Sequence, residues 1–255
     1  MMSRLEKIKK IREQLRSGGI SLGSWIQIPH ASIAEIMGQA GYDWVAVDME
    51  HGAISHHQLP DLFRGLELGD TLPLVRLAEG TKTNCKQALD AGAGGVIEPM
   101  VKSAKQLTDV RESCCWPPTG KRGVGYSRAN LFGKYFDAYS EEAQSPLLVA
   151  MIEHINAVAN LDDILAVEGL DAVLIGPYDL SASLGLTGQF DSLEFNRAIE
   201  QIRILCSQRN IPCGLHVVTP DDEYLKLLIK EGYRFIAYSL DSVFLSTSVE
   251  KPDIN

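Results

Sequence analysis

Short apolar runs alternate with segments of helical periodicity along the whole chain, and this alternation restricts the fold more than any other feature. The runs are rich in valine, isoleucine and leucine, and they lack the strict apolar and polar alternation of a half-exposed strand. Runs of this kind are typical of parallel strands that helices cover on both faces. The eight predicted strands are Ser21–Ile28, Trp44–Asp48, Leu72–Leu77, Gly94–Glu98, Leu147–Glu153, Ala172–Gly176, Pro212–His216 and Phe235–Ser239.

The segments between these strands carry the start and stop signals of helices. Ser32 and Glu35 have the spacing of a capping box, in which a hydroxyl and a carboxylate bond the free N–H groups of a first turn. Near the end of the chain, Thr219 is a predicted N-cap before Pro220, and Gly232 is predicted to end the helix that follows. Helices are therefore expected to connect consecutive strands.

Eight strand and helix units in 255 residues predict a (β/α)8 TIM barrel, a single α/β domain that spans residues 1–255. A chain of this length in which 45% of the residues are hydrophobic can bury one large core. A doubly wound open sheet of similar length stays open as an alternative, because it has the same alternation of strands and helices.

Two segments depart from this rhythm. Apolar residues at helical spacing within residues 5–15 predict a short amphipathic surface helix that ends at Gly18-Gly19, and not a targeting presequence. Residues 116–145 contain Pro117-Pro118 and several glycines but no continuous apolar run. They predict a long loop between strands four and five, which we expect to be functional or to contact a neighbouring subunit.

The charge and the cysteines restrict the partner and the compartment. The net charge is −9 at pH 7 with a pI near 5.2, so no attraction to nucleic acid or to an anionic membrane is expected. The five cysteines include no CxxC pair, which favours reduced thiols and a cytoplasmic protein. No run approaches the roughly 18 apolar residues that cross a bilayer. The expected partner is a small molecule.

Charged residues gather at the carboxyl ends of the predicted strands, where TIM barrels carry their chemistry. Asp48 and His51 end strand two, Arg76 lies in strand three, Glu153 ends strand five and Asp179 follows strand six. Closure of the barrel would bring these residues around one pocket. A charged group beside an apolar strand needs an ionic partner, a metal ion or a substrate.

Each of these residues also has a purely structural interpretation. Asp48 and His51 could form a turn, and Arg76 could form a salt bridge at the end of the barrel. Glu153 could pair with a neighbouring cation, and Asp179 could be the N-cap of a short helix. One shared site accounts for all of them more simply than separate pairings at four strand ends.

The two carboxylates suit a metal ion. Glu153 and Asp179 are not accompanied by histidines and cysteines at zinc spacing, so a hard cation such as Mg2+ or Mn2+ is expected. A 2-oxo acid could chelate that ion, and Arg76 would add positive charge beside the developing enolate. Backbone N–H groups around Gly176-Pro177-Tyr178-Asp179 are expected to receive the substrate carboxylate.

The proposed chemistry also needs a group that moves a proton. His51 follows Asp48 by three residues, and we expect the carboxylate to orient the imidazole as a general base. No predicted strand contains a lysine, which disfavours an aldolase that works through a Schiff base. These residues together predict a metal-dependent aldolase that acts next to a pyruvate-type enolate.

Several ordered motifs carry a resemblance to a known family. They are Gly41–Gly52, Glu98-Pro99-Met100-Val101, Lys121–Gly125 and Gly176–Ser181. On these motifs the chain resembles the HpcH/HpaI aldolase family, the class II 2-oxo-acid aldolases, from about Gly23 to Ser239. The resemblance implies a barrel with Mg2+, Mn2+ or Co2+ that cleaves or forms 4-hydroxy-2-oxo acids, giving pyruvate and an aldehyde.

The resemblance also implies roles for individual residues. The implied metal ligands are Glu153 and Asp179, the implied catalytic residues are His51, Asp48 and Arg76, and the implied substrate contacts are Gly176, Pro177, Tyr178 and Met151. Met151 stands where members of the family usually have a glutamine. Asp90 matches a position that reaches a neighbouring subunit's site, and the implied assembly is a hexamer, a trimer of dimers with exchanged C-terminal segments.

Other reactions stay open at this point. The same residues could serve another lyase that acts through a metal-bound enolate, for example on an acyl-CoA thioester or as a decarboxylase of an oxaloacetate-like acid. A non-catalytic homologue that binds metal and pyruvate is a third interpretation. The sequence does not choose the aldehyde, since residues 126–130 form a shorter loop than some members have.

Overall fold

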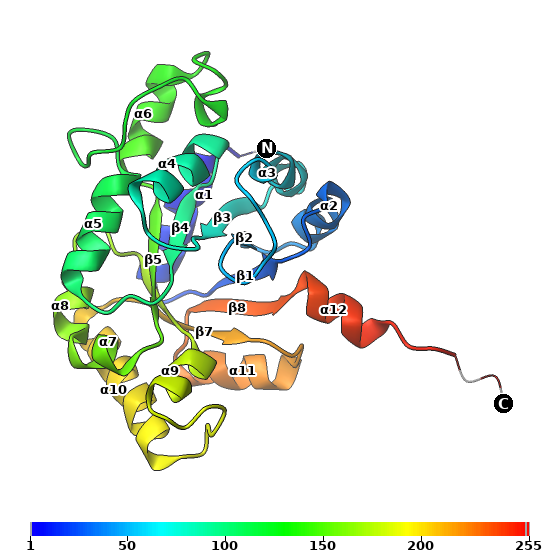
Figure 1. The fold of residues 1–255 in the computed structure, drawn as a ribbon, viewed down its shortest axis with the longest axis vertical. Helices are drawn as coiled ribbons and strands as arrows, with labels where there is room; N and C mark the ends of the chain where they lie inside the picture. The colour runs from blue at the N-terminus through cyan, green and yellow to red at the C-terminus, as the bar shows by residue number, and fades with distance from the viewer. Residues whose placement is uncertain (1, 253, 255) are drawn as a thin grey trace.

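A computed structural model describes residues 2–252 and 254, and it forms a closed barrel of eight parallel strands in chain order (Figure 1). The strands are β1 (Ser21–Ile26), β2 (Trp44–Asp48), β3 (Leu72–Arg76), β4 (Gly95–Glu98), β5 (Leu147–Ile152), β6 (Ala172–Ile175), β7 (Cys213–Val217) and β8 (Phe235–Leu240). Closure between β1 and β8 confirms the predicted TIM barrel and excludes the open sheet.

Helices surround the strands. They are α1 (Arg4–Arg16), α2 (Ala31–Gln39), α3 (Leu59–Leu68), α4 (Lys82–Ala91), α5 (Ala104–Cys114), η1 (Arg128–Asn130), α6 (Phe136–Gln144), α7 (Ile155–Ala159), α8 (Leu161–Leu165), α9 (Pro177–Ser183), α10 (Leu193–Arg209), α11 (Asp222–Glu231) and α12 (Asp241–Ser248). Within the described part of the chain, none of these helices is long and apolar enough to cross a membrane.

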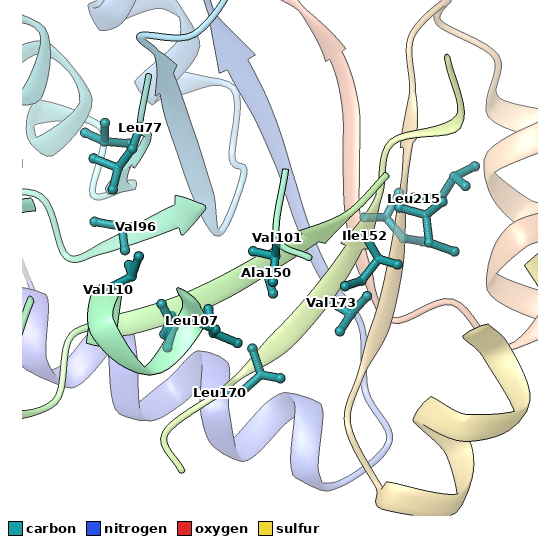
Figure 2. Packing of buried hydrophobic residues seen from close by; sticks show 14 of the residues in the cluster. Leu77, Val96, Val101, Leu107, Val110, Ala150, Ile152, Leu170, Val173 and Leu215 are labelled. Atoms are coloured by element: carbon teal, nitrogen blue, oxygen red, sulfur yellow. The ribbon is translucent and has the colours of Figure 1, made fainter. Parts of the chain in front are cut away.

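Side chains of each strand alternate between the barrel interior and the layer beneath the helices. In β2, Trp44 and Ala46 belong to the interior cluster, whereas Val45 and Val47 belong to the outer one. Figure 2 shows the outer layer, in which strand residues such as Val96 pack against Val110 of α5. Successive residues of a strand face opposite sides, so every second residue faces the interior. At the carboxyl ends of the strands, the residues that keep this spacing point into the barrel mouth.

Helix α1 closes the opposite end of the barrel, so its prediction as a surface helix was wrong for one of its faces. Ile8 and Ile11 are buried and belong to the same cluster as Trp44 and Leu72. The interior of the barrel is apolar at its amino end, and the apolar stripe of α1 covers it. The other face of α1 is exposed, and the helix ends just before Gly18, which has a left-handed φ of 79°.

Two predicted helix starts were displaced. Helix α2 is capped by His30, whose ring accepts a hydrogen bond from the Ser32 N–H, so Ser32 lies inside the helix. Helix α11 is capped by Asp221, which accepts from the Tyr224 N–H, and not by the predicted Thr219. Both true caps have extended backbone and a side-chain acceptor within reach of the first turn. The predicted stop at Gly232 is confirmed by its left-handed φ of 103°.

The segment at residues 116–145 is not a structureless loop as predicted. It contains η1 and α6, which pack around Trp116 and Tyr139 in a small cluster of their own. The apolar residues of this cluster are too scattered in sequence to show a helical period. Large apolar side chains nevertheless stay exposed around it, namely Val124, Tyr126, Leu131, Phe132 and Tyr135.

Helix α12 and the residues that follow it are directed away from the body of the barrel (Figure 1). Leu245 on this helix and Val249 after it are exposed. The five cysteines are all buried and free.

Candidate active site

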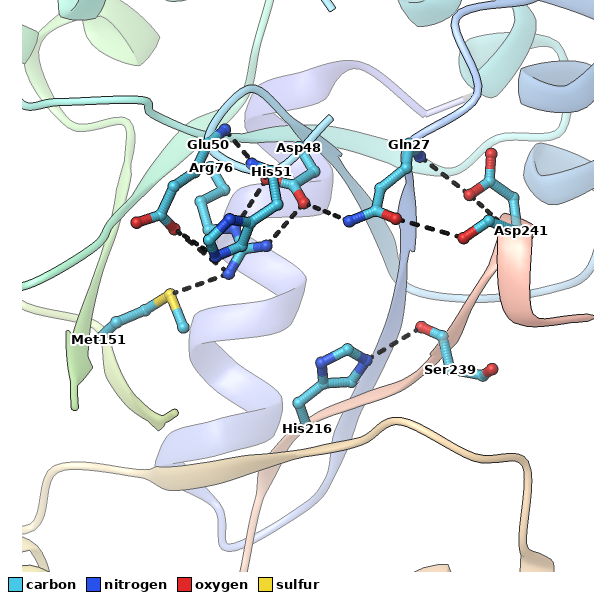
Figure 3. A network of polar contacts seen from close by, with 10 residues as sticks. Gln27, Asp48, Glu50, His51, Arg76, Met151, His216, Ser239 and Asp241 are labelled. Atoms are coloured by element: carbon cyan, nitrogen blue, oxygen red, sulfur yellow. Dashed lines mark hydrogen bonds and ion pairs between the residues drawn. The ribbon is translucent and has the colours of Figure 1, made fainter. Parts of the chain in front are cut away.

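Asp48 and Arg76 form the central ion pair at the carboxyl ends of β2 and β3, where they are paired in register (Figure 3). The Arg76 guanidinium donates from Nε to Asp48 Oδ1 at 2.8 Å and from Nη2 to Oδ2 at 2.6 Å. Burial alone would raise the pKa of Asp48, but the hydrogen bonds and charge of Arg76 hold that pKa below its usual value. The predicted salt-bridge interpretation of Arg76 is therefore realised inside the candidate site.

Asp48 is fully buried, and its carboxylate is fully occupied. Besides Arg76, Oδ2 accepts from Gln27 Nε2 at 2.8 Å, and Oδ1 accepts from the backbone N–H groups of Glu50 and His51 at 3.1 and 3.2 Å. Asp48 thus contacts His51 through the backbone and not through the imidazole. The His51 ring lies nearest to Glu50, with Nε2 at 3.8 Å from Oε2, and 57% of its side chain is exposed.

Glu50 joins the site as a residue to which sequence reasoning gave no separate role. Its Oε2 lies 3.4 Å from Arg76 Nη1, is buried, and accepts no hydrogen bond. Burial raises the pKa of Glu50, and the negative charges of Asp48 and Asp179 raise it further against the opposing effect of Arg76 and His51. The positive charges of Arg76 and His51 thus do not compensate for the burial of the Glu50 carboxylate and the negative charges beside it.

Glu153 follows β5 and is buried, with Oε1 accepting from the Met100 N–H at 2.6 Å. Its pKa is raised to about 7, first by burial and then by the charges of Glu50 and Asp179. Gly176, after β6, lies directly against this carboxylate, since a Cβ on Gly176 would come within 2.2 Å of Glu153 Oε2. Only glycine lets the two strand ends approach so closely.

Asp179 lies in the first turn of α9 and is exposed. The N-cap of this helix is Gly176, so the interpretation of Asp179 as a structural cap was wrong. Its charge acts on both Glu50 and Glu153, which places the three carboxylates around one region of the barrel mouth. Tyr178, beside it, is 57% exposed and packs edge-on against Phe190.

These carboxylates fit a hard divalent cation. The donors are oxygens, one oxygen of Glu50 is buried without a partner, and the nearest cation, Arg76, is already bound by Asp48. Among the described residues, no group of three or more His, Cys, Asp or Glu side chains is close enough to form a metal site by itself. The predicted role of Glu153 and Asp179 as metal ligands therefore stays a prediction, and the charge of Asp179 acts on the Glu153 carboxylate.

The floor of the mouth is formed by residues from other strands. Met151 places Sδ 3.9 Å from Arg76 Nη1, at the position where a glutamine was expected from the family resemblance. The Arg76 guanidinium lies over the ring of Trp25, 4.6 Å from its centroid, and His216 lies 5.7 Å from Trp25 between ring centroids. Trp25 on β1 and Gln27 just after it were missed, although their spacing of two residues gives the inward series that would have found them.

Asp90 does not reach the barrel mouth of its own subunit. It lies on α4, where burial raises its pKa against the opposing charges of Arg122 and Lys86. Its predicted role at a neighbouring subunit's site stays a prediction, as do the roles of Gly176, Pro177 and Tyr178 toward a substrate.

Comparison with known proteins identifies the family. The HpcH/HpaI aldolase/citrate lyase family matches residues 21–247. The hydroxypyruvate/pyruvate aldolase of Roseobacter denitrificans is 36% identical over 93% of both chains, and the 4-hydroxy-2-oxovalerate aldolase of Novosphingobium aromaticivorans is 35% identical over 92% of this chain and 89% of its own. The crystal structure of a family protein from Burkholderia cenocepacia superposes with a TM-score of 0.87 at 27% identity, covering 94% of this chain and 95% of that chain. The predicted resemblance is confirmed, and this chain belongs to the HpcH/HpaI aldolase/citrate lyase family.

Proposed function

We propose that this protein is a metal-dependent class II aldolase that cleaves or forms 4-hydroxy-2-oxo acids, with a pyruvate-type 2-oxo acid and an aldehyde as the other partners. The observation that carries the proposal is the buried Glu153 carboxylate beside the charge of Asp179, within a mouth whose only buried cation is Arg76 among the residues described for the site. Similarity to relatives named as pyruvate and 4-hydroxy-2-oxovalerate aldolases supports it.

Glu153 and Asp179 are the residues that would hold Mg2+, Mn2+ or Co2+, with Glu50 close enough to feel the same charge. A divalent cation bound there would supply a Lewis acid toward the keto oxygen of the substrate. Arg76 would stabilise negative charge that develops on that oxygen. Because Asp48 occupies Nε and Nη2 of Arg76, the Nη1 group, which lies toward Glu50 and Met151, is the one left for the substrate.

The proton is assigned to His51. Its exposed ring lies beside the Arg76 and Glu50 pair, where it can take the proton of the C4 hydroxyl as the C3–C4 bond breaks and return it when the bond forms. Glu50, 3.8 Å from the ring, would orient it, whereas Asp48 fixes the backbone of the same turn. Two carboxylates thus position the proposed base: Glu50 acts on its ring and Asp48 on its backbone.

Turnover tests this proposal. The purified protein is incubated with a 4-hydroxy-2-oxo acid and Mn2+, and the release of pyruvate is measured with a coupled dehydrogenase. We expect turnover that chelation stops and that Glu153→Ala and Asp179→Ala abolish without loss of the folded state, because ligands on barrel loops contribute more to the reaction than to the core. Unchanged turnover after stringent chelation would remove the metal from the proposal.

Substrate classes are separated in the same assay. An acyl-CoA thioester and oxaloacetate are supplied in place of the hydroxy-oxo acid. Faster cleavage of the thioester, or loss of carbon dioxide from oxaloacetate as the dominant reaction, would replace the aldolase with one of these lyases. Binding of metal and pyruvate without exchange of the pyruvate methyl protons would instead indicate a non-catalytic homologue.

We also propose that the protein acts in the cytoplasm as a homo-oligomer, a trimer of dimers with exchanged C-terminal segments. The outward direction of α12 and the exposed apolar side chains of Leu245 and Phe132 support an assembly. Light scattering coupled to size exclusion measures the mass, and removal of residues 241–255 is expected to reduce it. A monomeric full-length chain would contradict this part.

A further inference from the structure

His216 is an inward-facing residue of β7 that the proposed mechanism does not use. Its neighbours Leu215 and Val217 belong to the outer core, so the alternation of the strand points His216 into the barrel. In Figure 3 the imidazole is turned toward Ser239, and the Arg76 side chain lies above it in the view. The ring packs at a tilt of 49° against Trp25, on which the Arg76 guanidinium also lies.

The backbone of β8 fixes which nitrogen of this ring carries the proton. His216 Nε2 lies 3.3 Å from the carbonyl oxygen of Ser239, and a carbonyl oxygen can only accept a hydrogen bond. The proton of the neutral ring is therefore on Nε2, and Nδ1 presents a lone pair. Among the described residues, no group donates to this Nδ1 within hydrogen-bond distance.

Ser239 is held in an unusual conformation that serves this contact. Its φ is 52°, in the left-handed region that a residue with a side chain rarely occupies, and the β1–β8 register shifts between Gly23 and Trp25. The same carbonyl accepts from Ser24 Oγ at 3.2 Å, and Ser239 Oγ donates to the Val218 carbonyl at 2.9 Å. Strain of this kind persists only where surrounding contacts maintain it, and it often occurs at functional sites.

The ring also stays neutral at physiological pH. Burial is the main cause that lowers the pKa of His216 to about 4; the hydrogen bond to the Ser239 carbonyl opposes it in part, and the charge of Arg76 adds to the lowering. A neutral imidazole whose Nε2 is already donating can offer Nδ1 only as an acceptor. Its partner must then be a donor, and in the mouth of an aldolase that donor is a hydroxyl group, because the 2-oxo and carboxylate groups of the substrate only accept.

We propose that Nδ1 of His216 accepts a hydrogen bond from a hydroxyl group on the substrate, so that the enzyme prefers hydroxylated substrates to their deoxy counterparts. This inference rests on the proposed aldolase function and adds a substrate class to it. The hydroxyl can belong to the 2-oxo acid, as in 3-hydroxypyruvate, or to the aldehyde, as in glycolaldehyde. Without that hydroxyl the acceptor is left unpaired, which is the usual basis of discrimination by a polar pocket.

Kinetics with matched substrate pairs test the inference. One arm compares 3-hydroxypyruvate with pyruvate as donor at a fixed aldehyde, and the other compares glycolaldehyde with acetaldehyde at fixed pyruvate. In the comparison whose hydroxyl group contacts His216, His216→Leu is expected to lower the ratio of kcat/KM for the hydroxylated over the deoxy substrate by roughly ten- to a hundredfold. The ratio in the other comparison should stay unchanged. The kcat/KM for the deoxy substrate is measured alongside, so that a general loss of activity cancels in the ratio, and His216→Gln, which keeps an acceptor, should restore part of the preference.

The control is His57→Leu, since His57 is exposed and the one hydrogen bond found for its ring among the described residues is to the Ser55 hydroxyl. It should leave both ratios unchanged. Turnover by His216→Leu with unaltered ratios in both arms would overturn the inference and leave the aldolase function in place. Absence of turnover by the unmodified protein with every pair would instead overturn the proposed function and this inference with it.

Magnetic resonance gives a readout that a purely structural histidine would not show. In protein labelled with 15N-histidine, Nδ1 of His216 is expected to have the shift of an unprotonated nitrogen between pH 6 and 8. In the presence of Mg2+, the shift should move on addition of the preferred hydroxylated compound and stay fixed on addition of its deoxy counterpart. A protonated Nδ1 in the free protein would contradict the assigned tautomer, and this result remains informative if His216→Leu does not fold.

Discussion

The two nitrogens Nε and Nη2 of Arg76 are bound by the two carboxylate oxygens of Asp48 at 2.8 and 2.6 Å, and this pairing joins the ends of β2 and β3 beneath the barrel mouth. It leaves one nitrogen of the guanidinium directed at the site. Asp48 is fully buried, so the pair both supports the fold and orients the cation that the proposed reaction needs.

Replacement of Arg76 should therefore affect the stability of the fold as well as the rate of the reaction. Arg76→Ala leaves a buried carboxylate without its charged partner, and we expect a loss of about 3–5 kcal/mol in the free energy of unfolding. Arg76→Lys keeps the charge but not the two parallel hydrogen bonds, so it should unfold less readily than the alanine variant while kcat still falls by roughly 10²–10³-fold. Urea titration and steady-state kinetics measure the two effects. An Arg76→Lys enzyme with unchanged kcat would remove Arg76 from the reaction.

Gly176 offers a test of the candidate metal site that does not touch a ligand. In Gly176→Ala the new Cβ would come within 2.2 Å of Glu153 Oε2, so this carboxylate must move. We expect the affinity for Mn2+ to fall by roughly 10–100-fold, as for other changes that disturb the orientation of a ligand. Calorimetric titration with Mn2+ measures the affinity in the absence of substrate, and circular dichroism verifies the fold. Equal affinities in both proteins would show that Glu153 does not bind the ion.

The arrangement of the barrel could be read from the sequence because each strand is an uninterrupted apolar run, which only a covered parallel sheet accommodates. Glu153 and Asp179 could be placed at one end of it because parallel strands share their carboxyl ends. Local details could not. The cap of α2 is a histidine because its ring happens to reach the Ser32 N–H, and this depends on backbone geometry that a spacing of residues does not encode.

The hydrogen-bond partners of the site residues were the feature that the sequence predicted least well. Sequence proximity suggested that Asp48 orients the His51 ring, yet Arg76 and Gln27, from neighbouring strands, occupy the carboxylate first. Competition among several donors for one buried acceptor is decided by three-dimensional distance and charge. The sequence contains no signal of that competition.

His51 itself can be tested independently of its orientation. His51→Ala should lower kcat by roughly 10²–10⁴-fold if the ring is the general base. The exposed position of the ring leaves room for a small replacement, so added imidazole should restore part of the rate. Glu50→Gln, which changes only the group that orients the His51 ring, should lower kcat less than His51→Ala does. A rate within threefold of the unmodified enzyme would assign the proton to another residue.

Glu98 lies outside the mouth and should govern the response of stability to pH. Unlike the inward-facing Ile97, it points beneath the helices, where its Oε1 accepts a long hydrogen bond of 3.4 Å from Gln106 Nε2 and its Oε2 has no partner. Gln106 and the nearby Gly80 N–H offset only part of the effect of burial on its pKa. Burial raises its pKa from 4.5 to about 7. The folded protein therefore binds a proton that the unfolded chain releases at pH 4.5 and above.

The sign of the effect follows from this difference. Because the folded-state pKa is the higher one, the contribution of Glu98 is fully present below pH 4.5 and is lost as the pH rises through 7. At pH 8 the charged carboxylate should cost about 3 kcal/mol relative to a neutral group of the same shape. Glu98→Gln is thus expected to be more stable than the unmodified protein at pH 8, and to lose that advantage at pH 4.5, in urea titrations at the two pH values. Glu223→Gln, at an exposed position of α11, serves as the control with no such change. A Glu98→Gln protein that is less stable at pH 8 would mean that the carboxylate is charged and paired in the folded state.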